Sequence, residues 1–119
     1  MAEALAEYED KLKTLAGQLA GVGFMTRGSV VARHTHCGKT GCECHKDPAA
    51  LHGPYWQFSR AVGGKTVTRW ITEEQAVLYK EWIANRRSAL GILAEIEEVS
   101  LQAETLLQEG STQGDGQAP

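Results

Sequence analysis

The sequence predicts an α+β fold: an N-terminal helix, a small three-stranded antiparallel sheet with a zinc-binding loop, and a long C-terminal helix with a coiled-coil pattern. Three observations support this prediction. Apolar residues recur at helical spacing near both ends of the chain. Strand-like segments flank a Gly-Gly pair in the middle. All three cysteines of the 119-residue chain lie close together in sequence.

We expect four segments along the chain. They are an amphipathic helix over 1–24, a zinc-binding β domain over 25–71, a long helix over 72–109, and a disordered tail over 110–119. A chain this short buries only a modest fraction of its surface on folding. A bound metal or a partner chain would therefore help to stabilise it.

The first helix is predicted over residues 2–20, before Gly21 and Gly23. Its apolar residues follow one another at spacings of three and four, which places them on one helical face. They are Leu5, Tyr8, Leu12, Leu15 and Leu19. We expect this face to pack against the same chain, with a partner protein as the alternative.

Three strands are predicted over residues 28–36, 54–62 and 65–71. Gly63-Gly64 separates the last two, and Gly-Gly is a signal for a two-residue hairpin turn. The simplest arrangement is an antiparallel sheet in which the cysteine loop joins the first two strands.

The long helix is predicted from Thr72, a good N-cap with Gln75 three residues on, to about Glu109. Its apolar positions alternate by four and three, the spacing of a coiled-coil seam that would pair with a second copy or another protein. The seam runs through Leu78, Trp82, Asn85, Ala89, Ile92, Ile96, Val99, Ala103 and Leu106. Asn85 would fix its register, and Gly91 would permit the close approach of another backbone.

The three cysteines, Cys37, Cys42 and Cys44, predict a zinc site. Thiolates are typical zinc ligands, whereas three cysteines make a poor disulfide framework. We expect Gly38 and Gly41 to permit the tight turn, because glycine tolerates positive φ angles. Metal-binding thiolates suit a reducing compartment, and the N-terminus lacks a signal-peptide pattern, so we expect a cytoplasmic protein.

A histidine should supply the fourth ligand, and we favour His52. It lies eight residues after Cys44, and Gly53-Pro54 then redirects the chain. This arrangement suits a loop that returns a ligand to the cysteines.

Other fourth ligands remain open. His34 and His36 share one face of the first predicted strand, so either can point toward the metal. His45 adjoins Cys44, and adjacent side chains rarely reach one tetrahedral centre, which leaves His45 or water as a further alternative. The competing interpretation is a cluster of free or redox-active thiols without metal.

The sequence has no signature of an enzyme. It lacks a P-loop, a dinucleotide fingerprint, a serine nucleophile elbow and the zinc deaminase pattern. Four protein ligands would also fill a tetrahedral zinc sphere and leave no place for a catalytic water. No apolar run approaches the ~18 residues of a membrane span. We expect a structural metal, no enzyme activity and no membrane contact.

Basic side chains are concentrated in the middle of the chain. Residues 27–70 carry seven basic and two acidic side chains, a net charge of +5, whereas the preceding residues carry −2 and the following ones −6. Basic and aromatic residues together on a sheet can contact phosphates and bases. The predicted nucleic-acid-binding residues are Arg33, Arg60, Lys65 and Arg69. In the competing interpretation, the aromatic residues form the core and the basic ones a solvated face.

Several motifs together resemble a small microbial family of domains of unknown function, whose members are often found with mobile elements. The resemblance covers about residues 27–107. It rests on Cys37-Gly-Lys-Thr-Gly-Cys42-x-Cys44, His52-Gly-Pro-Tyr-Trp, Gly64-Lys65-Thr66 and Trp82-Ile-x-Asn-Arg-Arg. It implies the ligand set Cys37, Cys42, Cys44 and His52, and it implies no activity. The Gly-Gly-Lys hairpin before a helix is also similar to the three-stranded DNA-binding arm domains of phage-type integrases.

Two functions follow as hypotheses. The first is a small zinc-stabilised accessory protein that binds nucleic acid and is associated with a mobile genetic element. The alternative is a zinc-stapled protein-interaction module or helical adaptor without nucleic-acid contact. If Arg60, Lys65 and Arg69 share an exposed face, the first hypothesis gains.

Overall fold

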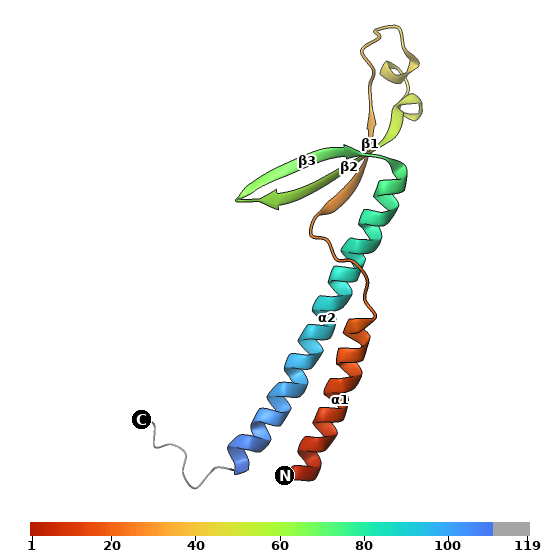
Figure 1. The fold of residues 1–119 in the computed structure, drawn as a ribbon. Helices are drawn as coiled ribbons and strands as arrows, with labels where there is room; N and C mark the ends of the chain where they lie inside the picture. Colours follow the sequence, from red (N-terminus) through yellow and green to blue (C-terminus); the bar gives the residue numbers. More distant parts are fainter. Residues whose placement is uncertain (111–119) are drawn as a thin grey trace. The chain divides into compact units, whose positions relative to one another are not determined.

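The computed structural model describes residues 1–110 (Figure 1). It confirms the predicted fold class: a helix, three antiparallel strands with a cysteine loop, and a long helix. The elements in chain order are α1 (Ala2–Ala20), β1 (Ser29–Thr35), the 3₁₀ helices η1 (Glu43–His45) and η2 (Pro48–Ala50), β2 (His52–Val62), β3 (Lys65–Ile71) and α2 (Glu73–Gly110). Most of the predicted tail, residues 111–119, lies outside the described residues.

The chain forms two compact units. One comprises residues 1–23 together with those from Arg87 onward, and the other comprises residues 24–86. Helix α2 contributes to both, its first part to the sheet unit and its second part to the helical unit.

In the helical unit, α1 and the second part of α2 run antiparallel (Figure 1). Leu15 of α1 and Val99 of α2 line one shallow groove. The predicted seam is the less exposed face of α2: Ala89 is 4% exposed, and Ile92 and Ile96 are half-buried. Leu78 is the exception at 48% exposed, and the other seam residues are buried or half-buried.

Gly91 does not serve as the expected point of close backbone approach. It is exposed, and a Cβ added there would meet nothing within 4 Å. The residue is a glycine in an open helix face, where its extra backbone freedom lowers helix stability.

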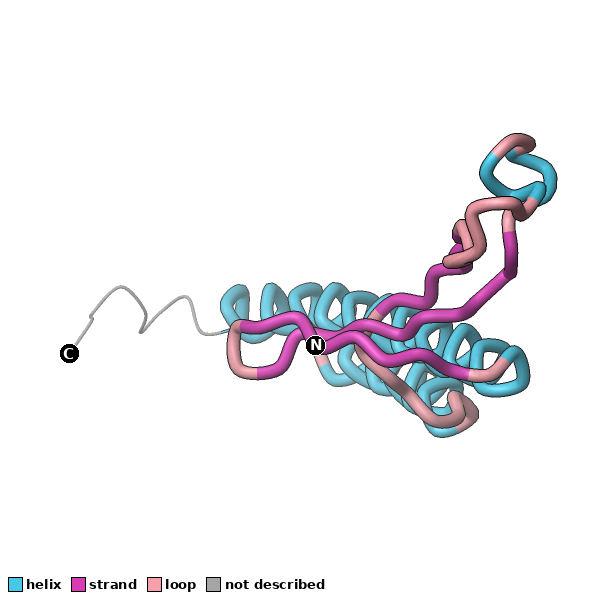
Figure 2. The backbone as a smooth tube through the Cα atoms, turned by 90° about the horizontal axis from the view of Figure 1, so that it is seen from above, coloured by secondary structure: helices cyan, strands magenta, loops and turns pink. Residues whose placement is uncertain are grey.

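The sheet has the strand order β1-β2-β3, with antiparallel neighbours. The three strands lie side by side in Figure 2, drawn in magenta. The β2–β3 hairpin turns at Gly63 and Gly64, both with positive φ, as the Gly-Gly pair predicts. Phe58 on the central strand pairs with Val30 on β1 and with Arg69 on β3.

Phe58 forms the centre of the sheet unit. Its side chain is 3% exposed and stacks on Tyr79 of α2, with ring centroids 4.0 Å apart. Tyr79 in turn meets Trp82 edge-on at 6.1 Å, and Trp82 contacts Phe24 at 5.0 Å. This aromatic stack holds the first part of α2 against the sheet, because burial of large apolar surface is the main favourable term in folding.

Three hydrogen bonds fix the ends of this packing. The predicted capping box is formed: Gln75 N donates to Thr72 Oγ1 at 3.0 Å, and Thr72 N donates to Gln75 Oε1 at 2.9 Å. Asn85 has a role that the heptad pattern did not indicate, since its Nδ2 donates to the carbonyl of Phe24 at 2.9 Å. Asn85 thus anchors the segment that follows α1.

Gly28 lets the chain enter β1 directly over the core. Its φ is +140°, and a Cβ there would lie 2.5 Å from the carbonyl oxygen of Ser59 and 2.7 Å from ring carbons of Phe58. Only glycine fits this backbone position without displacing the sheet.

Candidate metal centre

The loop between β1 and β2 is built from tight turns. The amide of His45 donates to the carbonyl of Cys42 at 3.1 Å, and Asp47 Oδ1 accepts from the amide of Ala49 at 3.0 Å, which caps η2. The expectation that glycines at 38 and 41 would use positive φ was wrong, because neither is among the positive-φ glycines of the described chain. The 3₁₀ helices η1 and η2 turn the chain instead.

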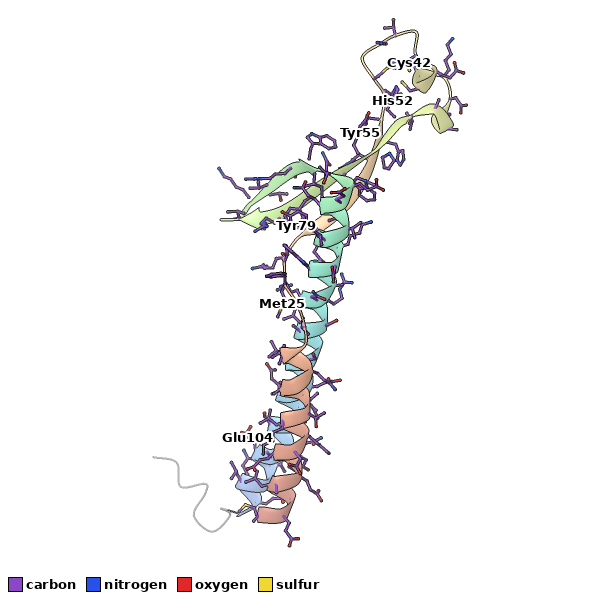
Figure 3. All side chains as sticks on the ribbon, turned by 45° about the vertical axis from the view of Figure 1, so that its right-hand side comes forward. Met25, Cys42, His52, Tyr55, Tyr79 and Glu104 are labelled. Carbon is purple, nitrogen blue, oxygen red and sulfur yellow. The ribbon has the colours of Figure 1, made fainter. Side chains whose placement is uncertain are left out.

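The loop brings Cys37, Cys42, Cys44 and His52 together. One ligand atom from each lies within 4.8 Å of all the others. The sulfurs of Cys44 and Cys37 are 3.6 Å apart, and Cys42 Sγ lies 3.3 Å from His52 Nε2. Figure 3 shows Cys42 and His52 close together in this loop.

These separations fit one tetrahedral ion. Zinc bound at its usual ligand distances would hold two sulfurs about 3.8 Å apart, and a sulfur and an imidazole nitrogen about 3.6 Å apart. The Cys44–Cys37 separation is far longer than the S–S bond of a disulfide, about 2.05 Å. Both distances lie close to the values for zinc, so the four residues are placed to hold one metal ion.

Cys44 is the innermost of the four, with 1% of its side chain exposed, and Cys37 and Cys42 are half-buried. The backbone amide of Cys37 donates to Cys44 Sγ at 3.3 Å. An amide donor of this kind offsets thiolate charge and orients the ligand.

The cysteines differ in acidity. A hydrogen bond from the backbone of Cys44, supported by the imidazole of His52, lowers the pKa of the Cys42 thiol to about 6. Burial is the largest influence on Cys44 and raises the pKa of its thiol. Cys42 therefore provides a thiolate, the form that binds metals, more readily than Cys44 does.

A β-bulge brings His52 to the cluster. Arg33 pairs with Tyr55, whereas two residues later Thr35 pairs with His52, so β2 contains one additional residue between these pairs. Without it, Thr35 would face Gly53. A Cβ on Gly53 would lie 2.5 Å from the carbonyl of Arg33, so the bulge also requires glycine.

Of the other three histidines, two lie beside this cluster. His36 and His45 stack with ring centroids 5.2 Å apart, and together with Cys44 they form a second group of close ligand atoms. Nε2 of His45 donates to the carbonyl of Cys37 at 2.9 Å. His34 is exposed and belongs to neither group. His45 thus supports the loop that carries Cys37, a role that ligand spacing alone did not predict.

The four predicted nucleic-acid-binding residues occupy two faces of the sheet. Directly paired residues project to the same face. Arg69 pairs with Phe58, Arg60 with Val67 and Lys65 with Val62, so the three basic side chains share the Phe58 face, and all three are exposed.

Arg33 lies apart from them. It pairs with Tyr55 on the opposite face, where its Nε donates to Gln57 Oε1 at 3.0 Å. The register therefore brings together three of the four residues.

A groove of about 290 Å³ lies on the Phe58 face. Its lining comprises Phe58, Arg60, Val62, Val67, Arg69 and Tyr79. The guanidinium carbon of Arg60 lies 5.0 Å from the centroid of the Phe58 ring, the distance of a cation–π contact.

The chain belongs to the family described as a domain of unknown function (DUF6788), which matches residues 5–81. The matched segment includes the cysteine loop, the sheet and the start of α2. Searches of curated proteins and of solved structures found no match. Within residues 1–110, no helix has both the length and the apolar character that crossing a membrane requires.

Proposed function

We propose that this member of the DUF6788 family is a zinc-stapled domain that binds nucleic acid through one face of its β2–β3 hairpin. Arg60, Lys65 and Arg69 on this face are called the basic hairpin face below. The observation that carries the proposal is their register, which directs all three exposed side chains to the same side of the sheet.

The proposed role of zinc is structural. Three thiolates and one imidazole make a closed tetrahedral set, and such sites contribute directly to folding. The ion would hold the loop between β1 and β2 and, through His52, the first residue of β2. With the sphere filled by protein ligands, we assign the domain no enzymatic role.

The basic hairpin face suits a phosphate backbone. Two of its guanidinium groups border a groove that also contains aromatic rings, Phe58 and Tyr79. Phosphate contacts position a nucleic acid without reading its sequence, so binding should be weak and nonspecific. The proposal also includes a cytoplasmic location. It further includes an association with mobile genetic elements, and the identity of the neighbouring genes would test that association.

Replacing Arg60, Lys65 and Arg69 together by alanine tests the proposal. We expect weaker binding to a random-sequence duplex, and a salt slope smaller by about three units because each phosphate contact contributes about 0.9. A matched control removes three charges from the helical unit, at Lys11, Lys13 and Arg87. Fluorescence anisotropy across a salt series measures the binding. Equal binding by wild type and the hairpin variant would refute the proposal.

A second candidate function is a protein-interaction module or homodimer formed through the helical unit. Apolar side chains on α2 support it, since Leu90, Leu93 and Leu101 are 46%, 43% and 56% exposed. Light scattering at high concentration tests self-association: a monomer would exclude the homodimer, and Leu93→Glu should dissociate a dimer.

A further inference from the structure

We propose a second binding site, at the end of β3, that accepts the cationic side chain of a lysine or arginine from a protein partner. The site is a cavity of about 580 Å³, here called the aromatic notch. Its lining includes Pro54, Tyr55, Trp56, Trp70, Ile71 and Glu73. None of these residues belongs to the metal cluster or to the basic hairpin face.

The notch arises because β2 is longer than β3. Strand β3 ends at Ile71, which pairs with Trp56, while β2 continues back to His52. The chain leaves the sheet after Ile71 and begins α2 at Glu73. The β2 edge beyond Trp56 therefore has no β3 residue beside it, and aromatic side chains surround the resulting space.

Tyr55 and Trp70 are both exposed aromatic residues. Trp70 is 62% exposed and Tyr55 47% exposed. Their rings lie 6.3 Å apart with an interplanar angle of 83°, so their faces point in perpendicular directions. Two perpendicular ring faces beside one cavity are the arrangement that binds organic cations, which rest within about 6 Å of ring centroids.

The charge of the notch favours a cationic ligand over a nucleic acid. Glu73 is the one charged residue in its lining, and no basic side chain of the described chain lines it. A carboxylate there repels phosphate and complements an ammonium or guanidinium group. The basic hairpin face and the notch therefore suit ligands of opposite charge.

A cation–π contact with a ring of the notch already occurs within the chain, at Lys80. Its Nζ lies 4.3 Å from the centroid of the Trp56 ring, although Lys80 does not itself line the cavity. Its ammonium covers one ring of the notch and adds positive charge nearby. Removing that charge should therefore strengthen binding of an external cation.

The test uses the full chain and two small probes of matched shape, N-acetyl-lysinamide and its neutral counterpart N-acetyl-norleucinamide. We expect the lysine probe to shift the indole N–H resonance of Trp70 in NMR titrations, and the norleucine probe to leave it unchanged. Trp70→Ala, monitored through the Trp56 indole resonance, should weaken lysine binding roughly tenfold. Glu73→Gln should weaken it roughly two- to fivefold, because Glu73 is exposed and solvent screens its charge. Lys80→Met should strengthen it roughly two- to threefold.

Val31→Ala is the control, because Val31 lies on the same sheet face as Trp70 but outside the notch. It should bind the probe like wild type. Equal responses to the two probes, or wild-type affinity in both Trp70→Ala and Glu73→Gln, would overturn the proposal. So would a Trp70 shift with a mononucleotide in place of lysine, which would reassign the notch to nucleic acid.

Discussion

The cysteine loop and the aromatic stack on the sheet differ in which residues are buried at their centres. In residues 36–51, the one buried residue is Cys44, a member of the candidate metal cluster. Around Phe58, by contrast, the buried contact is apolar, between its ring and that of Tyr79. With the proposed zinc bound, the loop would depend on coordination, whereas the stack depends on hydrophobic burial, so the two regions should fail under different perturbations.

Loss of the metal should have the largest effect, and it should fall on the loop. Purified protein should hold about one zinc per chain, and Cys42→Ser should abolish binding, because structural zinc contributes about 10–16 kcal/mol in small peptides. Elemental analysis gives the stoichiometry, and amide NMR spectra show which residues change.

His34→Ala is the matched control, since His34 lies outside the cluster. This variant should keep its metal. Freshly prepared, reduced wild-type protein without stoichiometric metal would contradict the zinc assignment.

Phe58→Ala should be the next largest perturbation, and it should act on the stack. Truncating a buried phenylalanine costs about 3–5 kcal/mol of unfolding free energy. Denaturant unfolding measures the loss, with Val67→Ala as the control because Val67 is 41% exposed. If the folded fraction of Phe58→Ala also loses its metal, the two regions are not separable.

Gly28→Ala should destabilise by about 1–3 kcal/mol, the cost of forcing an extra methyl group into packed structure. The new Cβ would approach the backbone of Ser59 and the Phe58 ring. Gly38→Ala is the counterpart in the loop, where a Cβ meets nothing within 4 Å. Thermal unfolding should separate the two variants, and an equal stability for both would show that the close approach at Gly28 is absent.

Gly91→Ala should produce the smallest change and the one increase in stability. The position is exposed and helical, and alanine is favoured over glycine there by about 1 kcal/mol. A higher melting temperature with unchanged metal content is the expected result. A lower one would mean that another backbone approaches α2 at this point after all.

The elements that could be predicted from the sequence are those specified by neighbouring residues. Thr72 and Gln75 form the capping box that their spacing indicates, and Gly63-Gly64 forms the hairpin turn. The clustering of His52 with the cysteines followed from similar reasoning about chain direction. In each case the interacting groups are close in sequence, so local geometry limits the outcomes.

The features that could not be predicted depend on residues far apart in the chain. The bulge before Tyr55 is defined by pairing with β1, and the need for glycine at position 28 is defined by Ser59 and Phe58. Asn85 has the spacing of a seam residue, yet it binds the carbonyl of Phe24. Periodicity identifies the face of a helix on which a residue lies, but not which distant backbone that face meets.

The junction at Thr72 has a consequence for the tolerance of this domain to insertions. A single residue joins the end of β3 to the start of α2, so the connection is too short to absorb an inserted residue. One added residue would turn the following helix by about 100° and advance it by about 1.5 Å. Tyr79 would then leave the Phe58 ring. Peptide tags should therefore be accepted at the Gly63-Gly64 tip and rejected at Thr72, where chain length sets the rotational phase of the helix.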